Sequence, residues 1–159
     1  MKPIKTNAMR MLDRAKIEYE SLFYEVDENN LAGTHIADQV GLPYSQVFKT
    51  IVAKGDKCGP CVFCIPVNEE IDLKLAASVS GNKKVEMVHV KDLLALTGYI
   101  RGGCSPVGMK KQFPTYFDEA ALLHEKITVS AGVRGCQLLI DREKLIEFAN
   151  AKVQKITRL

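Results

Sequence analysis

The spacing of apolar positions changes several times along this chain, and each change predicts a new element of secondary structure. Apolar residues three and four positions apart predict five helices. Residue types that cap helix N-termini precede four of them: Thr6 or Asn7, Thr34, Asp72 and Asp141. The fifth predicted helix spans residues 91–97. Glycines that stop a helix follow three of the five: Gly41, Gly81 and Gly98.

Runs that are rich in apolar and β-branched residues predict seven strands. They span residues 19–26, 45–53, 61–67, 83–88, 115–117, 127–130 and 136–140. Turn-forming residues at 54–60 and at 131–135 join neighbouring strands into two predicted hairpins. Because helices and strands alternate irregularly, we expect an α+β fold with a mixed sheet, in a single domain that covers residues 1–159.

The predicted strand 45–53 places one charge on an apolar face. Side chains alternate along a strand, so Lys49 shares its face with Val47, Ile51 and Ala53. An ammonium buried there without a partner would cost several kcal/mol or would lose its proton. Lys49 therefore either extends its amine to water or points it into a working pocket, and the pattern alone leaves both interpretations open.

The composition is that of an ordinary globular protein of 159 residues, with 47% hydrophobic and 26% charged residues. A formal net charge of +3 permits a polyanionic partner without requiring one. The first residues do not form the apolar core of a signal peptide, and no apolar run approaches the ~20 residues of a membrane span. We expect a cytoplasmic protein with no membrane contact, in which the five cysteines, an odd number, are thiols.

The motif Cys58-Gly59-Pro60-Cys61, followed by Cys64, raises the question of redox or metal chemistry. The tetrapeptide matches thioredoxin, whose first cysteine begins a helix, but here a strand is predicted to follow. Zinc would need four ligands, and the three histidines are scattered along the chain. We expect no metal and no cofactor. A redox role remains an alternative, and it predicts that Cys58→Ser and Cys61→Ser abolish activity.

The segment 102–108, Gly-Gly-Cys-Ser-Pro-Val-Gly, is the most irregular part of the chain. Its glycines can turn peptide N–H groups toward an anion or a developing oxyanion, although an ordinary tight connection has the same composition. Cys104 and Ser105 are candidate nucleophiles, but no histidine lies near either of them in the sequence.

Several basic residues are candidate phosphate contacts, although exposed lysine pairs most often form only a solvated surface. They are the pairs 83–84 and 110–111 with Lys54, Lys57, Arg101 and Arg134. Arg101 and the pair 110–111 are of particular interest because they flank the glycine-rich segment.

Four segments occur in an order and at a spacing similar to those of the YbaK/EbsC family of free-standing aminoacyl-tRNA editing proteins. They are residues 47–50, 83–87, 97–108 and 129–135. The resemblance extends from about Ala8 to the last predicted helix. It implies a compact α+β domain with a mixed, barrel-like sheet flanked by helices. The implied activity is deacylation of mischarged tRNA, typically Cys-tRNA(Pro) made in error by prolyl-tRNA synthetase.

The resemblance also implies a set of site residues. Lys49 would be the central polar group and Gly102–Pro106 the cradle for the carbonyl, with Lys49 and Gly102 as the catalytic residues. The implied substrate contacts are Tyr24, Ala32, Gly103, Ser105, Pro106, Ser130, Gly132 and Gln137. The family has Phe and Asp where this chain has Ala32 and Gln137, so these two positions are expected to influence the choice of amino acid.

In the resembled family, the thiol of the substrate cysteine attacks its own carbonyl, so no protein nucleophile is needed. This mechanism is consistent with the lack of a Ser/His or Cys/His pair in the sequence. The implied partners are tRNA and prolyl-tRNA synthetase, with no role for DNA. Two alternatives remain: a deacylase for Ala-tRNA(Pro) or another small amino acid, and a non-catalytic tRNA-binding module.

Overall fold

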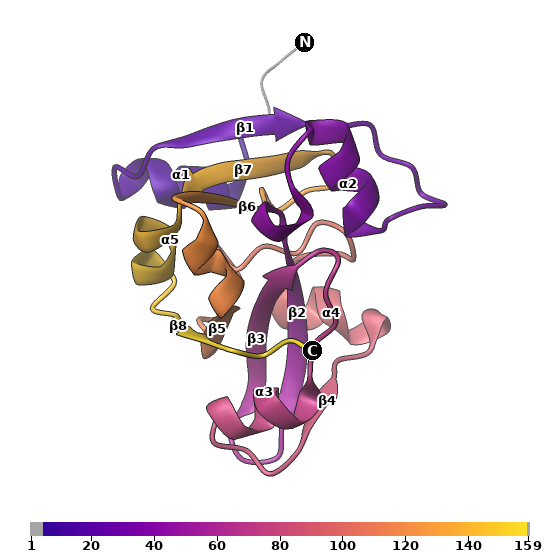
Figure 1. The fold of residues 1–159 in the computed structure, drawn as a ribbon, viewed down its shortest axis with the longest axis vertical. Coiled ribbons are helices and arrows are strands. Elements are labelled where there is room, and N and C mark those ends of the chain that lie inside the picture. The colour runs from indigo at the N-terminus through magenta and orange to yellow at the C-terminus, as the bar shows by residue number, and fades with distance from the viewer. Residues whose placement is uncertain (1–4, 159) are drawn as a thin grey trace.

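The structure, a computed structural model, describes residues 5–158, in which eight strands form two sheets (Figure 1). Residues 1–4 and residue 159 lie outside this range. The expectation that the chain starts without a signal peptide concerns residues 1–4 in part. The three-stranded sheet lies across the top of Figure 1. Its antiparallel order is β1 (Tyr19–Phe23), β7 (Cys136–Asp141), β6 (Lys126–Ser130).

The five-stranded sheet extends downward from the first sheet in Figure 1. Its order is β4 (Val85–Met87), β2 (Phe48–Gly55), β3 (Gly59–Pro66), β5 (Thr115–Asp118), β8 (Lys152–Gln154). The pairs around β2 are antiparallel, whereas β3–β5 and β5–β8 are parallel, so this sheet is mixed as predicted. Both predicted hairpins, β2–β3 and β6–β7, are confirmed.

A single bridge joins the two sheets. Val47, immediately before β2, pairs in parallel with Thr128 of β6. Beyond this bridge the two strands separate. Residues 48–50 of β2 pair with no described strand on that side, and the pairing of β2 with β4 starts only at Ala53, which lies opposite Met87. The expected barrel-like sheet is therefore two sheets joined at one point, with an opening beside the first residues of β2.

The five predicted helices are confirmed, with adjusted bounds. They are α1 (Asn7–Arg14), α2 (Gly33–Val40), α3 (Leu73–Val79), α4 (Val90–Thr97) and α5 (Arg142–Phe148). Thr6, Asp72 and Asp141 cap their helices as expected. The Thr34 cap was wrong, because α2 begins two residues earlier than that cap implies and its N-cap is Ala32, which makes no side-chain hydrogen bond. None of the described helices has the length and apolar character needed to cross a bilayer.

The two largest clusters of buried apolar residues lie on opposite faces of β3. Val62 and Cys64 face the cluster between the sheets, in which the rings of Phe48 and Phe117 lie 6.2 Å apart. The other face of β3 packs on α3: Cys61, Phe63 and Ile65. The run 61–67 is apolar at every position because the strand is covered on both sides.

Replacing Asp118 with Ala is expected to lower the free energy of unfolding by about 3 kcal/mol, because it leaves buried donors unpaired. The buried Asp118 carboxylate accepts hydrogen bonds from the N–H groups of Ala120 and Ile156, both at 3.0 Å, and from the Thr157 hydroxyl at 3.2 Å. Urea unfolding of the variant measures the loss. Glu119→Ala, at the exposed neighbouring acid, should stay within about 0.5 kcal/mol of the parent. Equal losses in both variants would contradict this interpretation.

Candidate functional site

A cavity of about 140 Å³ lies at the opening beside the first residues of β2. Four predicted site residues line it: Lys49, Gly102, Ser130 and Gln137. The other lining residues are Leu31, Gly33, Ile36, Val47, Phe48, Thr50, Val67 and Cys104. Segments that are far apart in the sequence therefore meet here, and the glycine-rich segment forms one wall.

Lys49 is half-buried and lines the same cavity as Gly102. Burial lowers the pKa of its amine, and the charges of Glu70 and Glu69 partly offset this by raising it. No carboxylate of residues 5–158 lies within ion-pair distance of the amine. This environment agrees with the interpretation in which Lys49 faces a pocket, and it leaves the amine able to donate to a ligand.

The Gly102 wall is a tight turn in which the Gly103 N–H donates to the Ile100 carbonyl oxygen at 2.9 Å. Gly102 is the third residue of this turn and has φ +84°, a conformation that favours glycine. Within residues 5–158, the N–H groups of Gly102 and Cys104 donate to no acceptor. Because Gly103 is used inside the turn, Gly102 and Cys104 are the candidate donors to a developing oxyanion.

Neither candidate nucleophile in this segment is suited to attack. Burial raises the pKa of the Cys104 thiol to about 12, so it is protonated at neutral pH. Ser105 is fully buried, and its Oγ accepts a hydrogen bond from the Val107 N–H at 3.2 Å. The cavity lining contains no histidine and no carboxylate that could activate either group.

Ser130 and Gln137 form a cross-strand pair of β6 and β7 at the cavity. The Ser130 Oγ accepts from the Gly132 N–H at 3.1 Å. The Gln137 Oε1 accepts from the Thr128 hydroxyl at 3.2 Å, whereas its Nε2 has no hydrogen-bond partner within the described part of the chain. Gln137 thus gives the cavity a neutral amide at the position where the resembled family has a carboxylate.

Tyr24 does not line the cavity but lies in a narrow recess of about 10 Å³ beside it. The recess shares Leu31, Ile36 and Gly102 with the cavity, so the two are adjoining parts of one site. It is otherwise lined by Glu25, Val26, Asp27, Asn30, His35 and Arg134.

Besides Tyr24, five predicted substrate contacts do not line the cavity: Ala32, Gly103, Ser105, Pro106 and Gly132. Ala32 is exposed before α2, whereas Gly103, Ser105 and Pro106 are buried within the loop. A Cβ at Gly132 would lie 2.9 Å from Cε1 of Tyr99, so this glycine makes room for a packed ring. None of the five is part of the cavity lining, and their contact with the substrate stays a prediction.

Sequence reasoning did not identify the apolar half of the cavity. Leu31, Ile36 and Val67 line it, and a Cβ at Gly33 would overlap the Val67 side chain. The one available signal was Gly33 directly before a predicted helix, since a glycine there indicates that a neighbour approaches closely.

The cysteine motif lies in the β2–β3 hairpin and is not arranged for either proposed chemistry. Cys58 is exposed in the turn, and burial raises the pKa of the Cys61 thiol to about 12, which is opposite to the activation that redox chemistry needs. Cys61 and Cys64 face opposite sides of β3. Within residues 5–158, no three His, Cys, Asp or Glu side chains gather as metal ligands.

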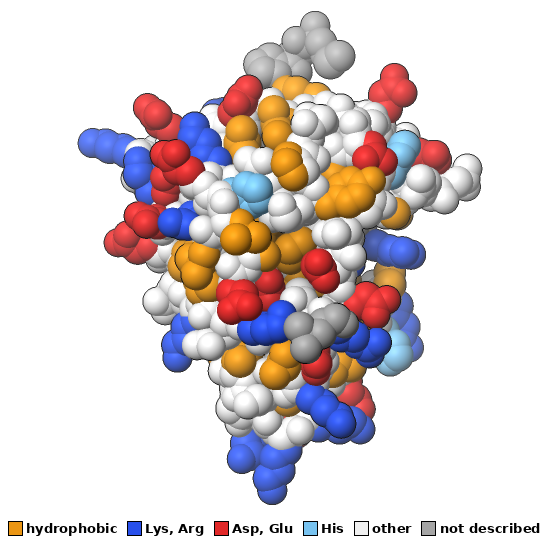
Figure 2. Space-filling view, in the orientation of Figure 1, with side chains coloured by type: hydrophobic (Ala, Val, Ile, Leu, Met, Phe, Trp, Pro, Cys, Tyr) orange, Lys and Arg blue, Asp and Glu red, His pale blue; other side chains and the backbone are white. Residues whose placement is uncertain are grey.

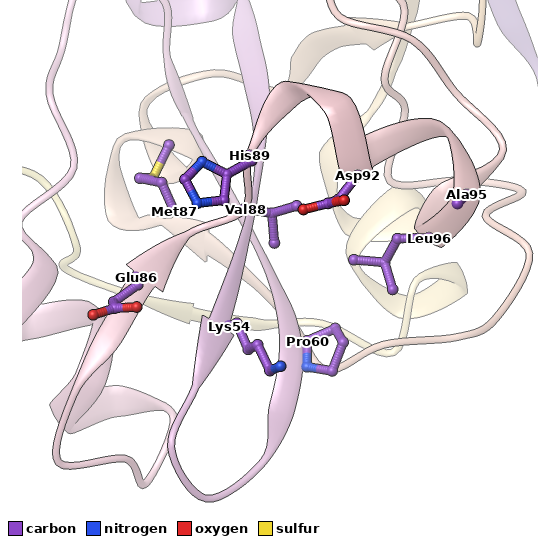
Figure 3. A pocket seen from close by; sticks show the side chains of 9 residues that line it. All are labelled: Lys54, Pro60, Glu86, Met87, Val88, His89, Asp92, Ala95 and Leu96. Atoms are coloured by element: carbon purple, nitrogen blue, oxygen red, sulfur yellow. The ribbon is translucent and has the colours of Figure 1, made fainter.

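A larger cleft of about 550 Å³ lies elsewhere, between the β2–β3 hairpin, β4 and α4 (Figure 3). Asp92 of α4 points toward the space between the labelled side chains, Glu86 lies at the edge on β4 with its carboxylate turned away, and Lys54 and Pro60 come from the hairpin. None of the predicted catalytic or substrate-binding residues lines this cleft, although Lys54 is one of the candidate phosphate contacts. Its size alone assigns it no function.

On the face of the molecule that Figure 2 shows, charge does not mark one binding surface. Figure 2 shows acidic and basic side chains mixed over most of the view, with basic ones gathered at the lower end. In Figure 1 that end is the β2–β3 turn, in which Lys57 lies. The recognition of a polyanion therefore has to be argued from individual groups at the site.

Solved structures with the same fold include two that cover nearly the whole chain. A crystal structure of a candidate trans-editing enzyme for prolyl-tRNA synthetase gives a TM-score of 0.83 at 22% identity, over 99% of this chain and 100% of that one. The crystal structure of the hypothetical protein APE2540 gives a TM-score of 0.84 at 19% identity, over 94% and 97% of the two chains. At these identities, the likeness shows the fold.

Sequence comparison identifies the family. An Enterococcus faecalis protein, EbsC, which is named as a candidate Cys-tRNA(Pro)/Cys-tRNA(Cys) deacylase, is 50% identical over 153 residues, or 96% of this chain and 93% of that protein. The family model of the aminoacyl-tRNA editing domain matches residues 33–148, which include Lys49, the Gly102 turn and the Ser130–Gln137 pair. This chain therefore belongs to the aminoacyl-tRNA editing domain family.

Proposed function

We propose that this protein is a trans-acting deacylase that hydrolyses mischarged Cys-tRNA(Pro). The observation that carries the proposal is the composition of the cavity. It combines one amine, Lys49, with the free N–H groups of Gly102 and Cys104, but its lining has no histidine or carboxylate to act as a base. Such a cavity can stabilise charge on a carbonyl oxygen. Because Glu25, Asp27 and His35 line only the adjoining recess, we expect the substrate to bring its own nucleophile.

Cysteine satisfies that requirement. Its sulfur attacks its own ester carbonyl, a carbon–sulfur bond forms, and the carbon–oxygen bond to the terminal ribose breaks. The thiol proton ends on the released ribose hydroxyl, and the amino acid leaves as a β-thiolactone, which water then opens. Lys49 and the two N–H groups hold the carbonyl oxygen while it carries negative charge. Gln137 Nε2 is a further neutral donor for the bound amino acid.

The name of the 50% identical relative supports cysteine as the amino acid. Alanine has no nucleophile, so its removal would require an activated water and therefore a base that the cavity lining does not provide. Prolyl-tRNA synthetase is proposed as the partner that supplies the mischarged tRNA, because a structural neighbour is described as its trans-editing enzyme. The whole chain, residues 1–159, is proposed to act as one editing domain.

Deacylation of three substrates tests the function. Wild-type protein is expected to cleave Cys-tRNA(Pro) and to leave both Ala-tRNA(Pro) and S-methylcysteinyl-tRNA(Pro) intact, because neither of the latter has a free thiol. Equal cleavage of the alanyl ester would replace this mechanism with a water-based one. Binding of all three without cleavage would instead identify a non-catalytic tRNA-binding module.

The double variant Glu69→Gln, Glu70→Gln is expected to shift the alkaline limb of the pH–rate profile to lower pH. The charges of both residues raise the pKa of Lys49, so without them the amine loses its proton earlier as the pH rises. The measurement is kcat/KM for Cys-tRNA(Pro) as a function of pH. Glu143→Gln, at an exposed acid of α5, is the control and should leave the profile unchanged. An identical profile in the double variant would show that the charge of Lys49 does not limit the rate.

A further inference from the structure

We propose that Arg134 is a positioning residue that binds the 5′-phosphate of the terminal nucleotide to which the amino acid is esterified. The proposal rests on the proposed function, since it places the ester in the cavity. It places the sugar–phosphate end of the substrate at the surface next to Arg134, outside the recess, which at about 10 Å³ is too small to hold it.

The guanidinium of Arg134 is fixed against the Gly102 turn. Its Nε donates to the carbonyl oxygen of Arg101 at 2.7 Å. A Cβ at Gly102 would lie only 3.2 Å from that Nε, so the absence of a side chain at Gly102 lets the arginine approach the turn. Gly102 also lines the cavity, and its N–H donates to no acceptor within residues 5–158. The Gly102 turn therefore carries the candidate donors to the substrate carbonyl and also holds the guanidinium of Arg134 in place.

The two Nη groups at the end of this anchored side chain remain open to a ligand. They make no hydrogen bond and no ion pair within residues 5–158. Glu25 and Asp27 also line the recess, but neither lies within 4 Å of the guanidinium, and the Asp27 Oδ1 accepts from the Asn29 N–H. Arg134 thus lies beside two carboxylates without pairing with them.

A phosphate matches this arrangement in chemistry and in place. The planar fork of an arginine donates two parallel hydrogen bonds to phosphate oxygens. In an aminoacyl ester of tRNA, the anion nearest to the ester is the 5′-phosphate of the same nucleotide, one sugar away. The cavity and the recess are adjoining and share Gly102. An ester held at the Gly102 N–H therefore directs its sugar toward Arg134.

Paired small substrates test this assignment: the 2′(3′)-O-cysteinyl esters of adenosine and of adenosine 5′-monophosphate. The wild type is expected to cleave the phosphorylated ester with a kcat/KM about tenfold higher, as expected for a charge-assisted contact. Arg134→Ala should bring this ratio close to one. Arg134→Lys, which keeps the charge but loses the fork, should retain part of it. Arg14→Ala, at an exposed arginine of α1, should leave both the ratio and the rates unchanged.

A ratio that Arg134→Ala leaves unchanged, or rates that fall by the same factor for both esters, would overturn the assignment and leave Arg134 a structural role. If the wild type cleaved neither ester, the proposed function would fail separately. The non-cleavable 3′-cysteinylamido analogues, with and without the 5′-phosphate, report on Arg134 in that case. Tighter binding of the phosphorylated amide that is lost in Arg134→Ala supports the assignment, and equal binding of the two amides contradicts it.

Discussion

Lys49→Ala is expected to lower kcat for Cys-tRNA(Pro) deacylation by roughly 10²–10³, the effect of losing one well-placed donor to a developing oxyanion. The amine lines the cavity, is half-buried and is paired with no carboxylate of residues 5–158, so nothing else there replaces its charge. Single-turnover deacylation measures the chemical step separately from tRNA binding. Binding of uncharged tRNA should change little, because the lysine acts on the ester.

Lys74→Ala provides the matched control, since it removes an exposed lysine from α3. It should deacylate at the parental rate. A Lys49→Ala variant that binds tRNA more weakly but cleaves bound ester at the normal rate would remove Lys49 from the chemistry. Lys49 would then have to be regarded as a binding residue.

The stability of a Lys49→Met variant separates function from folding. Burial holds the pKa of Lys49 in the native state below the ordinary value of 10.5. At pH values between the lowered native pKa and the unfolded pKa of 10.5, the unfolded chain binds more protons than the native one. The contribution of Lys49 to stability therefore rises with pH in this range. Below this range the native state bears the full cost of the buried charge. Lys49→Met should therefore be at least as stable as the parent at neutral pH, although it is inactive.

Local signals in the sequence predicted most of the elements because those elements depend on local chemistry. Asp72 and Asp141 cap α3 and α5 through their own side chains, and Gly41 and Gly98 end α2 and α4 in the left-handed conformation. The start of α2 was misplaced because it depends on tertiary contact. Gly33 must approach Val67 closely, and the helix start has no capping side chain from which the sequence could have predicted it.

Elements that exist only through long-range pairing were not predicted. β8 has three residues, Lys-Val-Gln, and it is a strand because it pairs in parallel with β5. The separation of the sheets beyond the Val47–Thr128 bridge likewise depends on how two distant hairpins meet. That separation opens the cavity. The cavity could therefore not be predicted from the sequence, although Lys49, which lines it, could be identified.

The candidate site divides in the same way. Lys49, Gly102, Ser130 and Gln137 were identified through the resemblance and do meet at the cavity. Pro106 and Gly132 belong to the same motifs but do not line the cavity, and Gly132 makes room for the Tyr99 ring, so their contact with the substrate stays a prediction. Arg134 was one candidate phosphate contact among several. Its bond to the Arg101 carbonyl, which distinguishes it from the other basic residues, is visible only in the structure.

Gly102→Ala is expected to reduce deacylation by roughly 10²–10³, because it displaces peptide donors that the reaction uses. Alanine at φ +84° is strained, and its Cβ would lie 3.2 Å from the Arg134 Nε and 3.6 Å from a Leu31 methyl group. Relief of that crowding must move the turn or the arginine. The two readouts are kcat for Cys-tRNA(Pro) and the free energy of unfolding, which should fall by about 1–2 kcal/mol from the backbone strain.

Gly81→Ala separates backbone strain from displacement of the site. Gly81 has φ +75°, close to that of Gly102, but a Cβ there would meet nothing within 4 Å. Both variants should therefore lose similar stability, whereas only Gly102→Ala should lose activity. If both variants kept full activity, the Gly102 N–H would not hold the carbonyl. If both lost activity to the same extent, the rate would depend on stability alone. If the reaction takes place at the Gly102 turn, only Gly102→Ala should lose deacylation activity.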